Sequence, residues 1–419
     1  MWTSSNTKRG FMAITAHYID GSWILQSQIL RFIYVPTSHT KEVLSDMLLS
    51  SLMDWNIDRK ISMITLYNCS TNDGMIVCLL EKLNASDLLI DGLVLQMRCA
   101  AHILNLIVKD GLEMMSGTIE RIRDSVVYWT TSAARIENFE EVARQLRISP
   151  TKKLSLDCKI RWNSTFLMLQ KASIYKDVFP RVKVREKYYT SLPNDDDWVV
   201  CNAICEKLKL FYQVTKMFSG TRYPTLNEFF AKVCHIKVSL AQWMKSQNCL
   251  IRVIAEKMMR KYQKNWEDCN VILGIAAVLD PRYKMKLIEY YFPVIYGDES
   301  FMKIEAICQN CFSLLHDYEY RSSLGGNRVD SQCMASHSEH VSGSHDKNEV
   351  ETDHLADFDK FVAFNSSDVT SKLELDFYPE ENVFPRVPTF EIFATYSTSE
   401  GISCNTLFDE EDDVNCVTE

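Results

Sequence analysis

The first hundred residues alternate between short runs of β-branched and aromatic residues and longer amphipathic segments. Asp20 and Gly21 separate the two longest runs, and Asp-Gly is a favoured hairpin turn, so the runs on either side are predicted to pair. Asn72 and Asp73 can cap a helix. The predicted order is strand 11–19, strand 24–35, helix 40–55, strand 61–66, helix 74–83 and strand 93–97. This order is typical of an α/β layered domain.

Residues 100–320 carry apolar side chains mostly at helical spacing. Pro150, Pro193 and Pro224 fall between the periodic segments, where chain breakers are expected. The predicted helices are 102–115, 119–131, 198–218, 226–244, 251–266 and 300–318. Residues 321–357 are rich in Ser, Gly, His and Asp, which predicts a disordered linker. Residues 395–419 hold seven acidic residues and no Lys or Arg, and are expected to form an acidic tail.

The net charge of −9 conceals a marked asymmetry along the chain. Residues 1–294 hold 39 basic and 29 acidic side chains, whereas residues 295–419 hold 7 and 26. Within the basic part, residues 141–190 hold 12 basic and 4 acidic side chains. Such a segment can attract a polyanion even in an acidic protein, or it can be a solvated helical surface.

The cysteine content and the apolar runs indicate an intracellular, soluble protein. The 14 cysteines are scattered, and residues 1–11 lack the apolar core of a secretory leader. No apolar run reaches the roughly 18–20 residues that span a bilayer, so no membrane is expected as a partner. We therefore expect free thiols in a reducing compartment.

Four stretches form an ordered series along the chain. They are Met1–Asp20 (MWTSSNTKRGFMAITAHYID), Arg98–Leu112 (RCAAHILNLIVKDGL), Asp157–Leu169 (DCKIRWNSTFLML) and Ala276–Gly297 (AAVLDPRYKMKLIEYYFPVIYG). Glu374–Phe393 is a weaker fifth. Taken together, the series resembles the hAT superfamily of DNA transposases, in particular its domesticated, RICESLEEPER-like plant members of the BED zinc finger type. The finger with which these relatives find DNA is not matched in this sequence.

The resemblance implies an α/β fold with an RNase-H-like sheet, incomplete at the N-terminus, a large and mostly helical insertion, and a disordered acidic C-terminal region. It implies DNA as a partner, a nuclear location and a homodimer or a heterodimer with related proteins. Dimerisation is in doubt because the match fades after about Phe393. The expected parts are an N-terminal RNase-H-like part (1–98), the helical insertion (99–225), an RNase-H-fold segment (226–320), a disordered linker (321–370) and a truncated remnant with the acidic tail (371–419).

The family's chemistry needs three acidic side chains that hold two divalent ions. The first Asp of the family precedes the Met-Trp-Thr-Ser stretch, with which this chain opens at Met1. The second precedes the Asn-Cys-Ser motif, and Tyr67 stands at its place. A phenol, with a pKa near 10, is a poor ligand for Mg²⁺. No third acid aligns, and Asp20 and Asp73 are assigned to a turn and a cap. The chain is therefore predicted not to be an enzyme and to need no cofactor.

Cys99 and His102 lie three residues apart and share a helix face in the prediction. They could form half of a zinc site, but no second ligand pair has suitable spacing. We interpret them as a structural motif and predict no metal.

The basic segment contains the best candidates for a DNA contact. A tryptophan among cations can stack on an unpaired base while the cations meet phosphates. The alternative is that Trp162 anchors the helical insertion. The candidates are Lys152, Lys153, Lys159, Arg161, Trp162 and Asn163.

The sequence as a whole favours DNA binding by a catalytically inactive, domesticated or truncated hAT-type transposase, with regulation as one role. The alternatives are a protein-interaction module that does not bind DNA and an active metal-dependent transposase. A steep dependence of DNA binding on salt would separate the DNA-binding function from the protein-interaction module.

Overall fold

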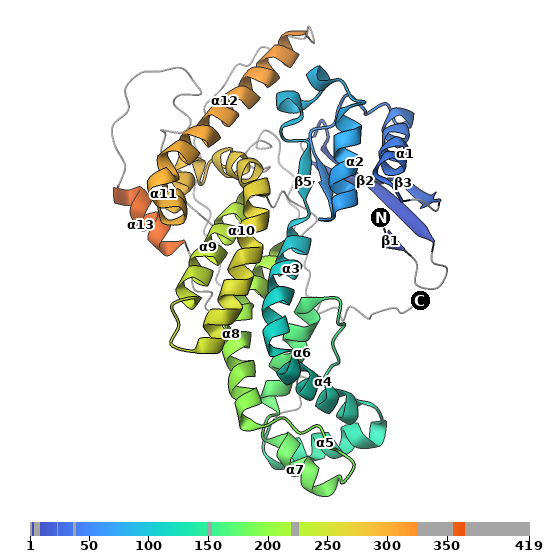
Figure 1. Ribbon diagram of the computed structural model, residues 1–419, viewed down its shortest axis with the longest axis vertical. Helices are drawn as coiled ribbons and strands as arrows, with labels where there is room; N and C mark the ends of the chain where they lie inside the picture. The colour runs from blue at the N-terminus through green and yellow to red at the C-terminus, as the bar shows by residue number, and fades with distance from the viewer. Residues whose placement is uncertain are drawn as a thin grey trace.

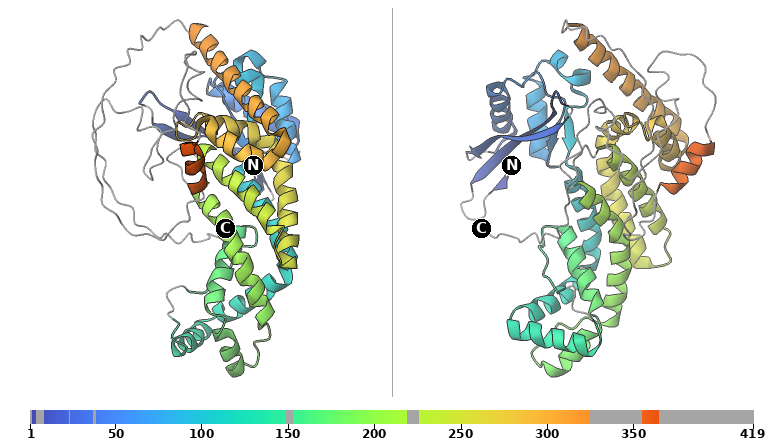
Figure 2. Two further views of the ribbon diagram at one scale, coloured as in Figure 1. Left: turned by 90° about the vertical axis from the view of Figure 1, so that its left-hand side faces the viewer. Right: turned by 180° about the vertical axis from the view of Figure 1, so that it is seen from behind.

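The computed structural model describes residues 2–3, 9–22, 24–36, 39–148, 153–218, 226–324 and 355–364. An α/β part lies beside the upper end of a long helical body, and a smaller group of helices forms the opposite end (Figure 1). Figure 2 shows that the α/β part covers one side of the body only. The predicted class, an α/β sheet followed by a large helical region, is confirmed.

The predicted hairpin is the largest part of the sheet. β2 and β3 pair antiparallel, with Phe11 opposite Tyr34, and the side chain of Asp20 accepts hydrogen bonds from the backbone N–H groups of Ser22 and Ile24 in the turn. Alternate residues point to opposite faces, so Met12 lies in the core with helices α1 and α2 while its neighbours face outward. The three-stranded sheet comprises β1 (Trp2–Thr3), β2 (Gly10–Ile19) and β3 (Leu25–Val35).

Two short parallel strands connect the α/β part to the helical body. They are β4 (Ile64–Leu66) and β5 (Gln96–Arg98). The helices of this part are α1 (Lys41–Asp54), capped by Thr40, and α2 (Ser70–Leu80). The prediction that Asn72 and Asp73 cap α2 is wrong, because α2 already begins at Ser70. Asn72 donates to the carbonyl of Tyr67, and Asp73 accepts from Gln96 and Arg98.

Four packed helices form the axis of the body. α3 (Ala100–Leu112) packs closely on α10 (Cys249–Val278), and Gly111 permits this approach, since a Cβ there would lie 2.8 Å from Met258. α8 and α9 complete the bundle, and α11 and α12 lie at its upper end (Figure 1). Their bounds are α8 Asp195–Phe218, α9 Leu226–Trp243, α11 Lys284–Tyr296 and α12 Ser300–Leu324.

We call the helices at the lower end of Figure 1, with the segments between them, the distal lobe (residues 116–190). Its core combines aliphatic side chains with a cluster of aromatic rings, among them Trp129, which lies 5.7 Å from Phe139 and 5.5 Å from Tyr189 between ring centroids. Only the first of its helices was predicted. The four are α4 (Ser116–Thr130), α5 (Ala133–Gln145), α6 (Trp162–Ile174) and α7 (Val178–Arg185).

The last described helix, α13 (Ala356–Phe364), lies within the predicted linker 321–370. The prediction of disorder is wrong there, because Phe358 is buried and packs on Tyr283 and Tyr290. The predicted remnant and acidic tail, 371–419, lie outside the described residues. Across the described part of the chain, no helix is both long and apolar enough to cross a membrane.

Candidate nucleic-acid interface

Tyr67 lies at the carboxyl end of β4, where polar groups of neighbouring parallel strands meet. Its side chain is 59% exposed, and its ring makes an edge contact with His102 at 5.4 Å between centroids. Asn68, the next residue, donates a 2.6 Å hydrogen bond to the buried Asn265 of α10. The strand end is thereby joined to the helical body through amide and aromatic groups.

The acid nearest in sequence to this strand end, Asp73, already has partners. Its carboxylate accepts from Gln96 at 2.8 Å and pairs with Arg98 at 3.2 Å. Over the part of the chain that the structure describes, no three His, Cys, Asp or Glu side chains are placed to hold one metal ion together. Around the end of β4 the described groups are thus a phenol, an imidazole, an amide and a carboxylate that is paired with Arg98.

Cys99 and His102 occupy the start of α3. The backbone N–H of Cys99 donates to the carbonyl of Leu66, which fastens α3 to β4. Burial, together with the positive charge of Lys109, lowers the pKa of His102, so its imidazole is neutral at pH 7 and packs on Tyr67. These contacts join the start of α3 to β4 and Tyr67, and the interpretation of the pair as a structural motif stays a prediction.

The Arg-Trp-Asn-Ser block begins helix α6. Trp162 is 3% exposed and packs against Phe166, so its ring is not available to stack on a base, and the alternative that it anchors the insertion fits the structure. Arg161 is exposed at the helix start, and Asn163 is half-buried. The hydroxyl of Ser164 accepts from the backbone N–H of Cys158 at 2.9 Å, which closes the turn before the helix.

A buried ion pair joins the segment just before this block to helix α4 of the same lobe. Both carboxylate oxygens of Asp157 accept from the guanidinium of Arg123, at 2.7 and 2.6 Å, and Thr165 donates a further hydrogen bond at 2.6 Å. Burial disfavours the charged carboxylate, but the bonds from Arg123 and Thr165 outweigh it and hold the pKa of Asp157 below its ordinary value. Such pairs, once formed, are costly to break.

The remaining predicted contacts differ in how free they are. Lys153 and Arg161 are exposed and form no ion pair with a described residue, whereas Lys159 lies 3.5 Å from Glu120. Lys152 lies outside the described residues. Lys153 and Arg161 are therefore available to bind an anion from outside the chain. Lys159 is less available, because it lies close to Glu120.

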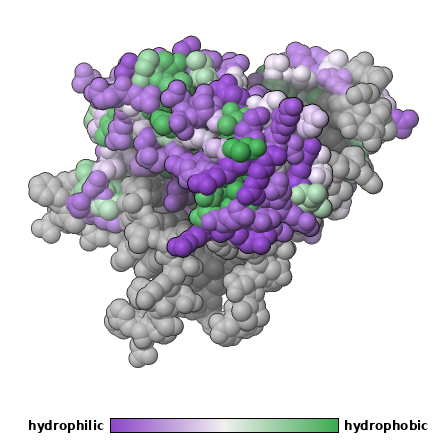
Figure 3. All heavy atoms as spheres, turned by 90° about the horizontal axis from the view of Figure 1, so that it is seen from below, coloured by the Kyte–Doolittle hydropathy of each residue, from purple (hydrophilic) through white to green (hydrophobic). Residues whose placement is uncertain are grey.

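The distal lobe carries further free cations that sequence reasoning had not singled out. Each is exposed and makes no ion pair within 4 Å to a described residue. With the two named above they number eight: Arg144, Arg147, Lys153, Arg161, Lys176, Arg181, Arg185 and Lys187. All eight come from the segment 141–190 whose excess of basic residues was the available signal. Figure 3, seen from the lobe end, shows a mainly hydrophilic surface with small hydrophobic patches.

The cations of the segment 282–286, outside the lobe, are buried or paired with acids. Arg282 is 8% exposed; it binds Asp280 at 2.7 Å and Glu228 at 3.3 Å. Burial opposes its charge, but the hydrogen bonds to Asp280 prevail and raise the pKa of Arg282. Lys284 is buried, and Lys286 pairs with Glu289 at 3.0 Å.

Comparison with protein-family models assigns three consecutive parts of the chain. Residues 1–94 match the ZBED1 RNase-like domain, residues 97–207 the ZBED1 RNase-like helical domain, and residues 227–318 the RNase-H fold of hAT-like transposases. These matches define the class as an RNase-H-like transposase fold with a helical insertion. The chain belongs to the hAT transposase-derived family, as its sequence predicted.

Plant proteins are among its relatives. The chain is 33% identical over 403 residues to the zinc finger BED domain-containing protein RICESLEEPER 2 of Oryza sativa subsp. japonica, an alignment that covers 94% of this chain and 55% of the relative. It is 30% identical over 397 residues to the zinc finger BED domain-containing protein DAYSLEEPER of Arabidopsis thaliana, covering 93% of this chain and 53% of the relative. The chain thus spans about half the length of these curated relatives.

Proposed function

We propose that this chain binds DNA through its distal lobe and does not cut it. The observation that carries DNA binding is the group of eight exposed cations in residues 141–190 that form no ion pair with a described residue. An unpaired surface cation attracts phosphate at little cost, because no existing ion pair has to be broken. Membership of a transposase-derived family supports the same assignment, and it supports a nuclear location.

The proposal that the chain does not cut DNA rests on Tyr67. A tyrosine at the end of β4 offers one phenolic oxygen, where the family chemistry uses a carboxylate with two. The neighbouring acid, Asp73, is bound to Arg98 and Gln96. No step of phosphodiester hydrolysis can be assigned to the groups at this strand end.

DNA binding is tested by titrating a fluorescently labelled 30-base-pair duplex with the full chain at several salt concentrations. If half or more of the eight cations meet phosphates, log K falls with log salt at a slope of about −4 or steeper, since each contact contributes about −0.9. A slope near zero, or no binding at low salt, contradicts the proposal and favours a protein-interaction module.

The same mixtures, supplied with Mg²⁺ or Mn²⁺, test for cutting. When the chain is in molar excess, the duplex is expected to stay intact on a denaturing gel, whether or not it carries the terminal sequences of a related transposon. Nicks that depend on the metal ion and disappear with EDTA would restore the active transposase as the function. A homodimer, or a heterodimer with a relative, stays a prediction, which light scattering after size exclusion can test.

A further inference from the structure

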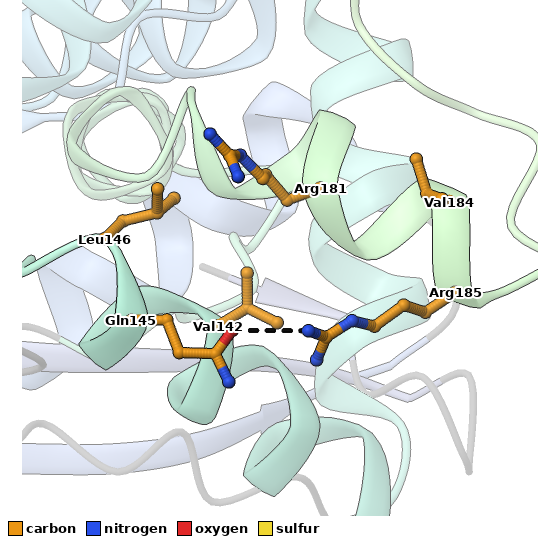
Figure 4. A pocket seen from close by; sticks show the side chains of 6 residues that line it. All are labelled: Val142, Gln145, Leu146, Arg181, Val184 and Arg185. Carbon is orange, nitrogen blue, oxygen red and sulfur yellow. Dashed lines mark hydrogen bonds between the residues drawn. The ribbon is translucent and has the colours of Figure 1, made fainter.

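A pocket of about 320 Å³ opens between helices α5 and α7 of the distal lobe. Arg181 and Arg185 of α7 extend across it toward α5, which contributes Gln145 and the apolar side chains of Val142 and Leu146 (Figure 4). Val184 completes the lining. This size is at the lower end of small-ligand pockets and is large enough for a sugar–phosphate unit.

The pocket has a positive charge that no described acidic side chain of the lobe pairs with. Arg181 and Arg185 are one helical turn apart, so their side chains emerge from the same face of α7. Asp177 and Glu186 are near them in sequence, but neither lies within 4 Å of either guanidinium, and Glu141 accepts from Gln145 instead. Arg185 donates only to the neutral Gln145, at 3.3 Å.

The positions of the two helices explain how such a site can exist without an anion. Gln145 and Arg185 are the last residues of α5 and α7, and the negative ends of helix dipoles favour cations there. The end of α7 therefore favours the charge of Arg185, which among the described residues donates to the neutral Gln145. Guanidinium groups that emerge from one helix face can both donate to the oxygens of one phosphate.

We propose that this pocket binds one backbone phosphate of a DNA strand, with the adjoining deoxyribose against Val142, Leu146 and Val184. Arg181 and Arg185 donate to the same phosphate, and Gln145 orients Arg185. The inference rests on the proposed DNA binding and deepens it, because it assigns one of the lobe's phosphate contacts to a defined pocket. The other six cations of the lobe then act as separate surface charges.

The first test is a double-mutant cycle on duplex binding at 100 mM salt. Arg181→Gln and Arg185→Gln are each expected to weaken binding about tenfold, as a charged hydrogen bond to phosphate does. Because both serve one phosphate, the double variant should lose little more than each single variant. Losses that multiply to about a hundredfold would mean two independent contacts and would overturn the shared site.

Matched controls separate this inference from the proposed function. Arg260→Gln with Lys264→Gln removes the same charge from exposed positions on α10 that form no ion pair with a described residue, and it should leave binding within about twofold. If the unaltered chain binds no DNA, the proposed function fails. If it binds DNA and the pocket variants behave as the α10 variant does, only the pocket inference fails. If Arg181→Gln and Arg185→Gln lower the melting temperature but leave affinity unchanged, the arginines serve the helix ends alone.

A second, nearly isosteric variant tests the pocket without removing a cation. Gln145→Glu places a carboxylate beside Arg185, which should pair with it and repel phosphate, so duplex binding is expected to weaken by about tenfold. Gln170→Glu is the control, since Gln170 is an exposed residue on α6 of the same lobe and does not line the pocket. Equal effects of the two changes would reduce the pocket to general surface charge and refute the inference.

Discussion

Replacing Asp157 with alanine is expected to lower the free energy of unfolding by about 3–5 kcal/mol, because one partner of a buried ion pair is removed and the other is left charged. Arg123 is nearly buried, and without Asp157 it keeps only Glu120, whose carboxylate is half exposed. Thr165 also loses its acceptor. The change should appear as a lower urea midpoint of the chain, followed by circular dichroism.

The control for this prediction is Asp124→Ala on the same helix as Arg123. Asp124 is exposed and forms no ion pair with a described residue, so its loss should change stability by less than about 0.5 kcal/mol. If Asp157→Ala costs less than about 1 kcal/mol, the ion pair does not hold the Arg-Trp-Asn-Ser block on the lobe.

Neutralising four surface cations of the lobe outside the pocket should weaken duplex binding roughly 10²- to 10³-fold at 100 mM salt. Each phosphate contact contributes about 0.9 to the salt slope, and so about eightfold at this salt, and not all four need to meet a phosphate. The substitutions, all to glutamine, are at Lys153, Arg161, Lys176 and Lys187. Because all four side chains are exposed, the melting temperature should hardly change.

A variant of equal charge controls for net charge alone. It carries glutamine at four exposed cations of α8 and α10 that form no ion pair with a described residue: Lys209, Lys216, Arg260 and Lys264. The net charge of both variants is four units more negative, yet only the lobe variant is expected to lose affinity by more than about tenfold. Equal losses would show that long-range attraction, and not the distal lobe, accounts for binding.

Much of the α/β part could be predicted from sequence because its signals are local. The Asp20-Gly21 turn and the alternation on either side fix the β2–β3 pairing, and the structure has both. The contacts at the end of β4 were harder to predict from the sequence. Asp73 looks like a helix cap in the sequence, but in the fold it faces Arg98, which is 25 residues away. No local pattern can predict a contact between two strands and a helix of this kind.

The distal lobe shows a different limit of sequence reasoning. Trp162 lies among basic residues in the chain, and that composition is compatible with base stacking as well as with core packing. Only the fold decides, because burial of the indole depends on α6 meeting its neighbours. Conversely, Arg181 and Arg185 carry no motif, and their significance comes from the pocket that α5 and α7 form between them.

The location of bound DNA tests the central claim most directly. A duplex that carries 4-thiothymidine at several positions can be cross-linked to the chain by light, and the modified peptides can be identified by mass spectrometry. We expect the cross-links to fall in residues 141–190, on α5, α6, α7 and the segments between them. Cross-links confined to the β2–β3 sheet or to the body helices α9–α12 would contradict the account.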